Sequence, residues 1–193
     1  MSKRIFTGAG DEGETGFLSG ERIAKDDPQV EAYGTVDELI SVLGIGKIHS
    51  SQRIANYIQK IQETLFYVNT ELAVKPDSLS IESIRNLRRI TAKDVDELEK
   101  IADELSEELP LLRNFVIPGG TAASSFLHLS RTVCRRAERR IISFAKINRV
   151  NGELLRYMNR LSDLLFILSR YENLESGDGD TIVSREGIKK MTK

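Results

Sequence analysis

Five arginines fall within the ten residues R-T-V-C-R-R-A-E-R-R at positions 131–140, which contain one carboxylate, Glu138. A helix turns by about 100° per residue, so Arg131, Arg135 and Glu138 would share one flank of it. A guanidinium can donate two hydrogen bonds to one phosphate. The excess of positive charge predicts an anion on this flank: a phosphate, a nucleic acid or a carboxylate from a neighbouring element. The packing side of the helix would hold Phe126, Val133, Ala137, Ile141 and Phe144, while Arg136 and Arg140 would point away from both sides.

A second candidate for phosphate chemistry is the glycine-rich stretch T-G-A-G-D-E-G-E-T at residues 7–15, followed by Lys25. Successive free backbone amides in such a loop can bind phosphate oxygens. The stretch formally matches G-x-G-x-x-G, but the dinucleotide fingerprint needs a strand before it and a helix that opens at it. Neither is predicted here, and no Gly-Lys-Ser/Thr follows. The loop by itself is compatible with a phosphate cradle or with a surface terminus.

The remaining residue types offer little other chemistry. Neither of the two histidines belongs to a Glu-x-x-His motif, which argues against a carboxylate-bridged two-metal site, and there is no G-x-S-x-G nucleophile motif. The identity of any metal ligand stays unknown. The single cysteine, Cys134, excludes an internal disulfide and a cysteine-based zinc site, and we expect it to be a packing residue. We expect His128 to make a structural hydrogen bond.

Length and charge favour one globular domain over residues 1–193, because a chain of this size can bury a core. The formal net charge of −1 argues against general attraction to nucleic acid or to a membrane. No apolar run is long enough to span a bilayer, and the N-terminus has no apolar targeting segment, so we expect a cytoplasmic protein. Within the domain, residues 1–27 would form an irregular nucleotide-binding loop, and residues 175–193 a polar tail that can be partly mobile.

Apolar residues at helical spacing predict an all-α, up-and-down bundle of long helices joined by short loops. Asp27 and Pro28 fit the N-cap and first residue of a helix, and Thr91 with Asp94 fits a capping box. Residues 76–90 are assigned at most one or two helical turns. The predicted helices cover residues 28–49, 53–74, 91–109, 120–147 and 152–174.

The last of these helices also has a polar flank. Asn159, Asp163, Phe166 and Arg170 fall within about 60° of one another, away from the leucine side. An aromatic ring among polar groups is compatible with the wall of a ligand site or with an ordinary, partly exposed phenylalanine.

Three segments taken together resemble the PduO-type ATP:cob(I)alamin adenosyltransferases. They are T-G-A-G-D-E-G-E-T with Lys25, E-A-Y-G-T-V-D-E-L at 31–39, and R-T-V-C-R-R-A-E-R followed by Y-M-N-R-L-S-D at 157–163. The similarity covers about residues 4–173 in the right order. The arginine segment with N-R-L-S-D is highly specific to that family, whereas the glycine-rich loop alone is not.

The resemblance implies a five-helix bundle that forms a homotrimer, with active sites between neighbouring subunits. It implies that Asp37 pairs with Arg131 across the interface and that the corrinoid lies against Phe115 and Phe166. Many members have Lys or Arg where Gly8 stands, so one phosphate contact would be missing or made by the main chain. The ATP contacts implied are Thr7, Gly8, Ala9, Gly10, Thr15, Gly16, Lys25, Arg135, Arg136, Ala137, Glu138, Arg139 and Asn159, and the residues implied in catalysis are Arg135, Glu138, Lys25, Arg131 and Asp37.

The reaction that the resemblance implies moves the 5′-deoxyadenosyl group of ATP onto the cobalt of reduced cobalamin and releases triphosphate. Mg²⁺ would accompany ATP, and a cobalamin reductase could be a partner. Two other readings stay open. In one, the chain is a non-catalytic helical scaffold with a cationic docking surface. In the other, the arginine flank binds nucleic acid or another phosphate.

Overall fold

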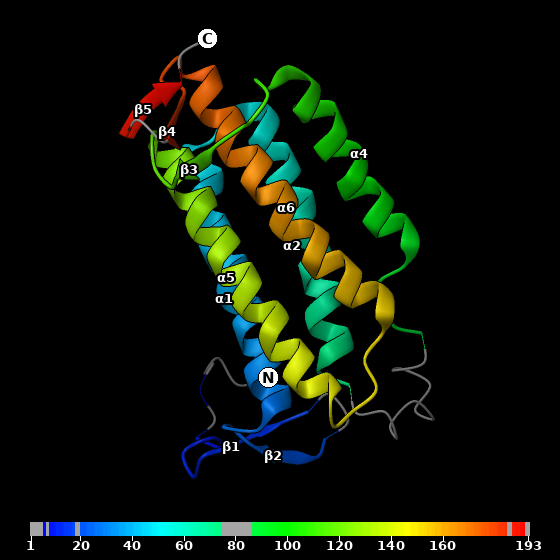
Figure 1. Ribbon diagram of the computed structural model, residues 1–193. Coiled ribbons are helices and arrows are strands. Elements are labelled where there is room, and N and C mark those ends of the chain that lie inside the picture. The colour runs from blue at the N-terminus through cyan, green and yellow to red at the C-terminus, as the bar shows by residue number, and fades with distance from the viewer. Residues whose placement is uncertain (1–5, 7, 18–19, 75–85, 185–186, 192–193) are drawn as a thin grey trace.

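The computed structural model describes residues 6, 8–17, 20–74, 86–184 and 187–191. Over these residues the chain folds into five helices that alternate in direction, as an up-and-down bundle requires (Figure 1). Helix α1 packs against α5 and α2, and α6 packs against α5 and α4. The predicted fold class is therefore confirmed. The helices are α1 (Pro28–His49), α2 (Gln52–Leu72), α4 (Ala92–Glu108), α5 (Ala122–Ala145) and α6 (Gly152–Glu175).

Side-chain caps fix where the helices begin. Asp27 accepts a hydrogen bond from the backbone N–H of Gln29 at 2.8 Å, with Pro28 at the first helical position. Thr91 and Asp94 form a capping box before α4. Both predicted starts are confirmed. The turns expected within residues 76–90 lie mostly outside the described residues.

The core lies between the helices, where the predicted periodicity placed it. All the positions predicted for the packing side of α6 are fully buried, and Cys134 is buried with its thiol directed at the carbonyl of Met158, 3.4 Å away. On α1 the packing side is rotated slightly, so that Val30 and Tyr33 are half-buried while Ala32 and Val36 are fully buried. The buried residues of α6 predicted from the sequence are Leu154, Met158, Leu161, Leu165 and Leu168.

Five short strands depart from the prediction, which had assigned none. Strands β1 (Glu14–Gly16) and β2 (Arg22–Ala24) pair antiparallel in the glycine-rich stretch, so its expected irregular structure was wrong there. Strands β3 (Phe115–Ile117), β4 (Asp180–Ser184) and β5 (Gly187–Met191) form an antiparallel sheet in the order β3-β4-β5. Such short strands show no usable alternation, and the partner of β3 lies far along the chain.

The two small sheets lie at opposite ends of the bundle, β1–β2 beside the start of α1 and β3–β5 beside the start of α5 (Figure 1). Among the described helices, none is both long enough and apolar enough to cross a lipid bilayer.

Candidate functional site

A hollow of about 240 Å³ lies between α5 and α6, on the arginine flank. Its two cations come from α5, and its other lining residues come from the part of α6 that contains the N-R-L-S-D motif. The cationic flank predicted for α5 and the polar flank predicted for α6 therefore meet at this hollow. The lining residues are Arg131, Arg135, Ser162, Asp163, Phe166 and Ile167.

Two of the five arginines are neutralised by α1. Arg136 forms an ion pair with Glu38, and Arg140 forms one with Glu31 at 3.0 Å. The segment 131–140 itself contains a single acid, Glu138, because α1 is remote in the chain. A carboxylate from a neighbouring element was one of the three anions predicted for the arginines. For these two arginines that alternative holds, so Arg136 is already paired within the chain.

Arg131 and Arg135 keep their charges available. Neither forms an ion pair within the part of the chain that the structure describes, and the buried Nε of Arg131 has no hydrogen-bond partner. Burial first, and repulsion from Arg135 second, lower the pKa of Arg131. Arg139 donates to the carbonyl of Arg135 at 3.1 Å and extends the same stripe by one turn. Arg131, Arg135 and Arg139 thus form a cationic stripe, and no described carboxylate makes an ion pair with it.

The acids near the stripe are already bonded elsewhere. Glu138 accepts a hydrogen bond from Asn159 at 3.1 Å, and Asp163 accepts one from Arg160 at 3.0 Å. Ala137 is fully buried, so its methyl group cannot reach a ligand in this chain. Over the described residues, no group of three or more histidine, cysteine or acidic side chains converges as a metal site would require.

His128 lies beside Phe166, with their ring centroids 5.9 Å apart in an edge-on arrangement. Its Nε2 is 3.2 Å from the hydroxyl of Ser169, which itself donates to the carbonyl of Phe166 at 2.7 Å. Because that proton is used, Nε2–H must donate, and Nδ1 is left as a buried acceptor without a partner. The expected structural hydrogen bond is confirmed. Burial and the nearby charge of Arg131 lower the pKa of His128 to about 4.

This histidine makes stability depend on pH. Its pKa in the folded chain, about 4, lies below its ordinary value of 6.5, so the unfolded chain binds more protons between these values. The contribution of His128 to the free energy of unfolding is therefore fully present above pH 6.5. It is lost as the pH falls towards 4, and the loss is at most about 3 kcal/mol. Urea midpoints measured at pH 7 and pH 5 should differ more in wild type than in His128→Gln, whose amide can still donate to Ser169. Equal differences in the two proteins would contradict the assignment.

The glycine-rich loop is folded on itself by two basic side chains. Lys25 Nζ donates to the carbonyl of Gly10 at 2.6 Å, and Arg22 donates to the carbonyl of Ala9 at 2.5 Å. Gly8 and Gly13 have φ of 73° and 81°, which their lack of a side chain permits. Lys25 is exposed and has two further N–H donors for a ligand. Thr15 and Gly16 lie in β1, and Thr7 lies outside the described residues.

Within one chain, the loop and the hollow are separated along the bundle. The loop precedes α1, whose first turns face the end of α5 through Glu31 and Arg140. Arg131 lies nine residues before Arg140, a rise of about 13 Å along the helix. Asp37 is exposed on α1, and its carboxylate has no partner among the described residues. The residues that line the hollow come from α5 and α6 alone, and none of the predicted loop residues is among them.

The two predicted corrinoid contacts differ in exposure. Phe166 is half-buried in the wall of the hollow, whereas Phe115, in β3, is 86% exposed. Arg170, grouped with Phe166 on the polar flank of the predicted helix, does not reach this surface. It is buried and paired with Asp180 at 2.7 Å. The tail therefore supplies the partner of this side chain.

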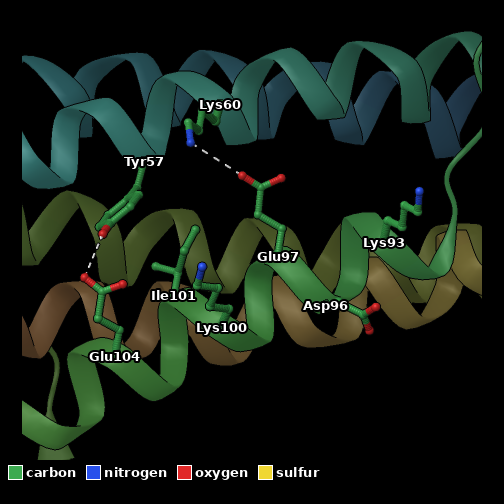
Figure 2. Close-up of a pocket in the computed structure, with 8 residues that line it drawn as sticks. All are labelled: Tyr57, Lys60, Lys93, Asp96, Glu97, Lys100, Ile101 and Glu104. Carbon is green, nitrogen blue, oxygen red and sulfur yellow. Dashed lines mark hydrogen bonds and ion pairs between the residues drawn. The ribbon is translucent and has the colours of Figure 1, made fainter.

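A larger hollow, of about 460 Å³, lies on another face of the bundle between α2 and α4 (Figure 2). Two contacts join the helices across it: Lys60 with Glu97 at 3.5 Å, and the hydroxyl of Tyr57 with Glu104 at 3.3 Å. Acids and bases alternate there, in contrast to the unbalanced cations of the α5–α6 hollow. Size alone would favour this hollow, but its three lysines are balanced by three acids, so it has no excess of positive charge for an anionic ligand.

Two lining residues, Ser162 and Ile167, were not predicted as members of the site, whereas Asp163 and Phe166 were placed on the polar flank of their helix. Ser162 and Ile167 follow Asn159 and Asp163 by three and four residues respectively, which is the spacing that brings side chains onto one helix face. That spacing was the signal available in the sequence.

Comparison with known proteins identifies relatives over almost the whole chain. The sequence model of the family described as cobalamin adenosyltransferase matches residues 5–172. The corrinoid adenosyltransferase of Bacillus subtilis is 37% identical over 96% of this chain and 94% of its own length. A corrinoid adenosyltransferase of Citrobacter freundii is 43% identical over 88% of this chain and 94% of its own length.

Solved structures agree with the sequence comparisons. A variant of the PduO-type ATP:corrinoid adenosyltransferase from Lactobacillus reuteri, complexed with cobalamin and ATP, superposes with a TM-score of 0.87 at 32% identity, covering 95% of this chain and 98% of that one. Another variant of it, complexed with ATP, gives a TM-score of 0.85 at 33% identity, covering 93% of this chain and 100% of that one. On the family match, the sequence identities and the shared fold together, the chain belongs to the cobalamin adenosyltransferase family.

Proposed function

We propose that this protein transfers the 5′-deoxyadenosyl group of ATP to the cobalt of cob(I)alamin, forming adenosylcobalamin and triphosphate. The observation that supports this most strongly is the hollow between α5 and α6 in a chain of this family. There, Arg131 and Arg135 present two guanidinium groups without a carboxylate partner among the described residues. A polyphosphate is the kind of ligand that such a surface would bind.

The chemistry requires no nucleophilic side chain. Cobalt in the Co(I) state donates an electron pair to C5′ of ATP, a Co–C bond forms, and the C5′–O bond breaks with triphosphate as the leaving group. The protein has to align cobalt with C5′ and to neutralise the charge that the triphosphate gains. Arg135 and Lys25 would supply that charge, together with the amides of the glycine-rich loop. Glu138, held by Asn159, would orient Arg135 or help to hold the metal or the ribose.

The complete site would be formed between subunits of a homotrimer. The loop of one subunit would then reach the cationic stripe of its neighbour, in agreement with a hollow that no loop residue of the same chain lines. Asp37 and the buried Nε of Arg131 each lack a partner among the described residues, as expected for two halves of an intersubunit ion pair. Arg139 and Arg136 would complete the phosphate contacts from the arginine helix.

Mg²⁺ would bind with ATP rather than in a cage made by the protein. This ion keeps several waters and takes only one or two carboxylates besides phosphate oxygens. The described acids fit that pattern, because two carboxylates, Glu138 and Asp163, lie beside the stripe and no group of three or more possible ligands converges there. The ion would neutralise part of the triphosphate charge.

Phe115 and Phe166 would form the apolar wall for the corrin ring. By filling the lower side of the ring, Phe115 would exclude water and the displaced base from cobalt, which makes Co(II) easier to reduce. A cobalamin reductase would supply the electron. We place the reaction in the cytoplasm.

Two measurements test this function. Saturating MgATP should raise the thermal midpoint, since a ligand at 100 times its Kd stabilises the fold by about 2.7 kcal/mol. With chemically reduced cobalamin and ATP, the visible spectrum should change from Co(I) to alkylcobalamin while triphosphate is released. No stabilisation and no spectral change would instead favour a scaffold. Binding to nucleic acid that weakens steeply with salt would favour the nucleic-acid alternative.

The Asp37–Arg131 pair gives a prediction about assembly. Arg131→Ala and Asp37→Ala should each weaken adenosyl transfer or the subunit contact, and the double variant should be no worse than the more impaired single variant. The measurement is a double-mutant cycle on kcat/KM and on the sedimentation profile. For a paired charge we expect a coupling of at least about 0.5 kcal/mol. Additive losses would show that the two residues are not partners.

A further inference from the structure

The C-terminal tail is bonded to the segment that contains Phe115, although residues 5–172 are the part that the family model matches. Among the described strands, β3 lies at the edge of its sheet and pairs with β4 alone, in a register that places Phe115 opposite Val183. Since Phe115 is 86% exposed, packing of its side chain does not fix its position. The position of this ring depends on the backbone of β3, and thus on what holds that backbone.

Asp180, the first residue of β4, is the anchor of the tail. Its carboxylate is 4% exposed and is bonded to two side chains of α6. Oδ2 accepts from Nε of Arg170 at 2.7 Å, and Oδ1 accepts from Nδ2 of Asn173 at 3.2 Å. A buried carboxylate needs such partners to compensate for its lost hydration.

The same two side chains of α6 hold both ends of the segment around Phe115. Arg170 Nη2 donates to the carbonyl of Pro110 at 2.8 Å, before β3. Asn173 Nδ2 donates to the carbonyl of Gly119 at 3.0 Å, and its Oδ1 accepts from the N–H of Thr121 at 3.1 Å, after β3. The bonds run without a break from one end of the segment, through Asp180, to the other.

The approach between Asn173 and this segment is unusually close. Gly120 has φ of +103°, and a Cβ added there would lie 2.1 Å from Oδ1 of Asn173. Only glycine permits both that backbone conformation and that contact. The turn after β3 is therefore shaped around the amide that Asp180 orients.

We propose that Asp180 is a positioning residue for corrinoid binding: through Arg170 and Asn173 it fixes the backbone of residues 110–121 and so the place of Phe115. The choice of the corrinoid as ligand rests on the proposed function, in which Phe115 forms the wall for the corrin ring. In that function the arginine stripe binds the other substrate, ATP. Loss of the Asp180 carboxylate should therefore affect the two substrates unequally.

The test compares Asp180→Asn, which keeps the size of the side chain, with Asp178→Asn, an exposed acid of the same tail. In Asp180→Asn the KM for chemically reduced cobalamin should rise at least about fivefold, because a charged hydrogen-bond pair is lost. Affinity for MgATP, measured by titration calorimetry, should stay unchanged. Amides of residues 115–121 should exchange with deuterium at least about tenfold faster, while those of α2 should not change. Asp178→Asn should match wild type in all three measurements.

Unchanged exchange at residues 115–121, or an unchanged KM for cobalamin in an active enzyme, would overturn the inference. A parallel loss of affinity for both substrates would also overturn it, since Asp180 would then only stabilise the fold. If Asp180→Asn does not fold, Val183→Pro decides by the same readouts, because a proline in the central strand β4 disrupts the small sheet that holds β3, outside the helical core. A wild-type protein without adenosyl transfer would refute the proposed function, while the exchange measurement would still test the hold of Asp180 on the segment.

Discussion

The Arg135→Ala variant should lose at least tenfold in kcat/KM for adenosyl transfer. Arg135 lines the hollow between α5 and α6, and its guanidinium has no carboxylate partner among the described residues, so its charge is available to a triphosphate. A hydrogen bond to a charged group contributes about 1.5–3 kcal/mol. Because about 1.4 kcal/mol corresponds to a factor of ten in rate, the loss should be readily measurable from initial rates at varied ATP concentrations.

Two further variants make that result specific. Arg135→Lys keeps the charge but loses the planar fork, so it should fall between wild type and Arg135→Ala. Lys60→Ala removes a cation from the larger hollow, where Lys60 pairs with Glu97 (Figure 2), and should leave turnover unchanged. If Arg135→Ala turns over like wild type at saturating ATP, the α5–α6 hollow is not the ATP site. If Lys60→Ala loses turnover, the hollow between α2 and α4 contributes to the reaction instead.

The second large effect concerns stability. Arg170→Ala should lower the free energy of unfolding by about 3–5 kcal/mol, because it leaves the buried carboxylate of Asp180 without its cation. The carbonyl of Pro110 would lose its donor as well. Urea denaturation at pH 7, followed by circular dichroism, measures this change directly.

The double variant Arg170→Met with Asp180→Leu provides the decisive comparison. It removes both charges and should recover much of the lost stability, since no uncompensated ion remains. Arg156→Ala, which breaks the exposed pair with Glu153, is the control and should change stability by no more than about 1 kcal/mol. A loss in Arg170→Ala no larger than that of the control would mean that the buried pair contributes little.

The helices and their packing sides could be predicted from the sequence because each depends on residues only three or four positions apart. Leu154, Met158 and Leu165 recur at that spacing, and all are buried. Caps such as Asp27 act over the same short range. The strands could not be predicted in this way, because Phe115 pairs with Val183, and nothing near either residue indicates the other.

The same limit applies to the site: residues on one helix could be grouped from the sequence, but contacts between distant helices could not. The periodicity of α5 identified Arg131 and Arg135 as members of one flank, and the structure places both at the hollow. It could not show that Arg136 is paired with Glu38, because that ion pair joins two helices distant in sequence. Nor could it show that Arg170 is paired with Asp180, because that partner belongs to the tail and a helical wheel represents only one helix.

The buried position of Cys134 gives the protein an intrinsic reporter of unfolding. The thiol is 0% exposed, burial raises its pKa, and the sequence contains no other cysteine. A thiol-specific reagent such as a chromogenic disulfide should therefore react only when the bundle opens. The rate of colour development would then measure opening events in the untagged, unmodified protein, and a bound substrate that holds the helices together would slow it.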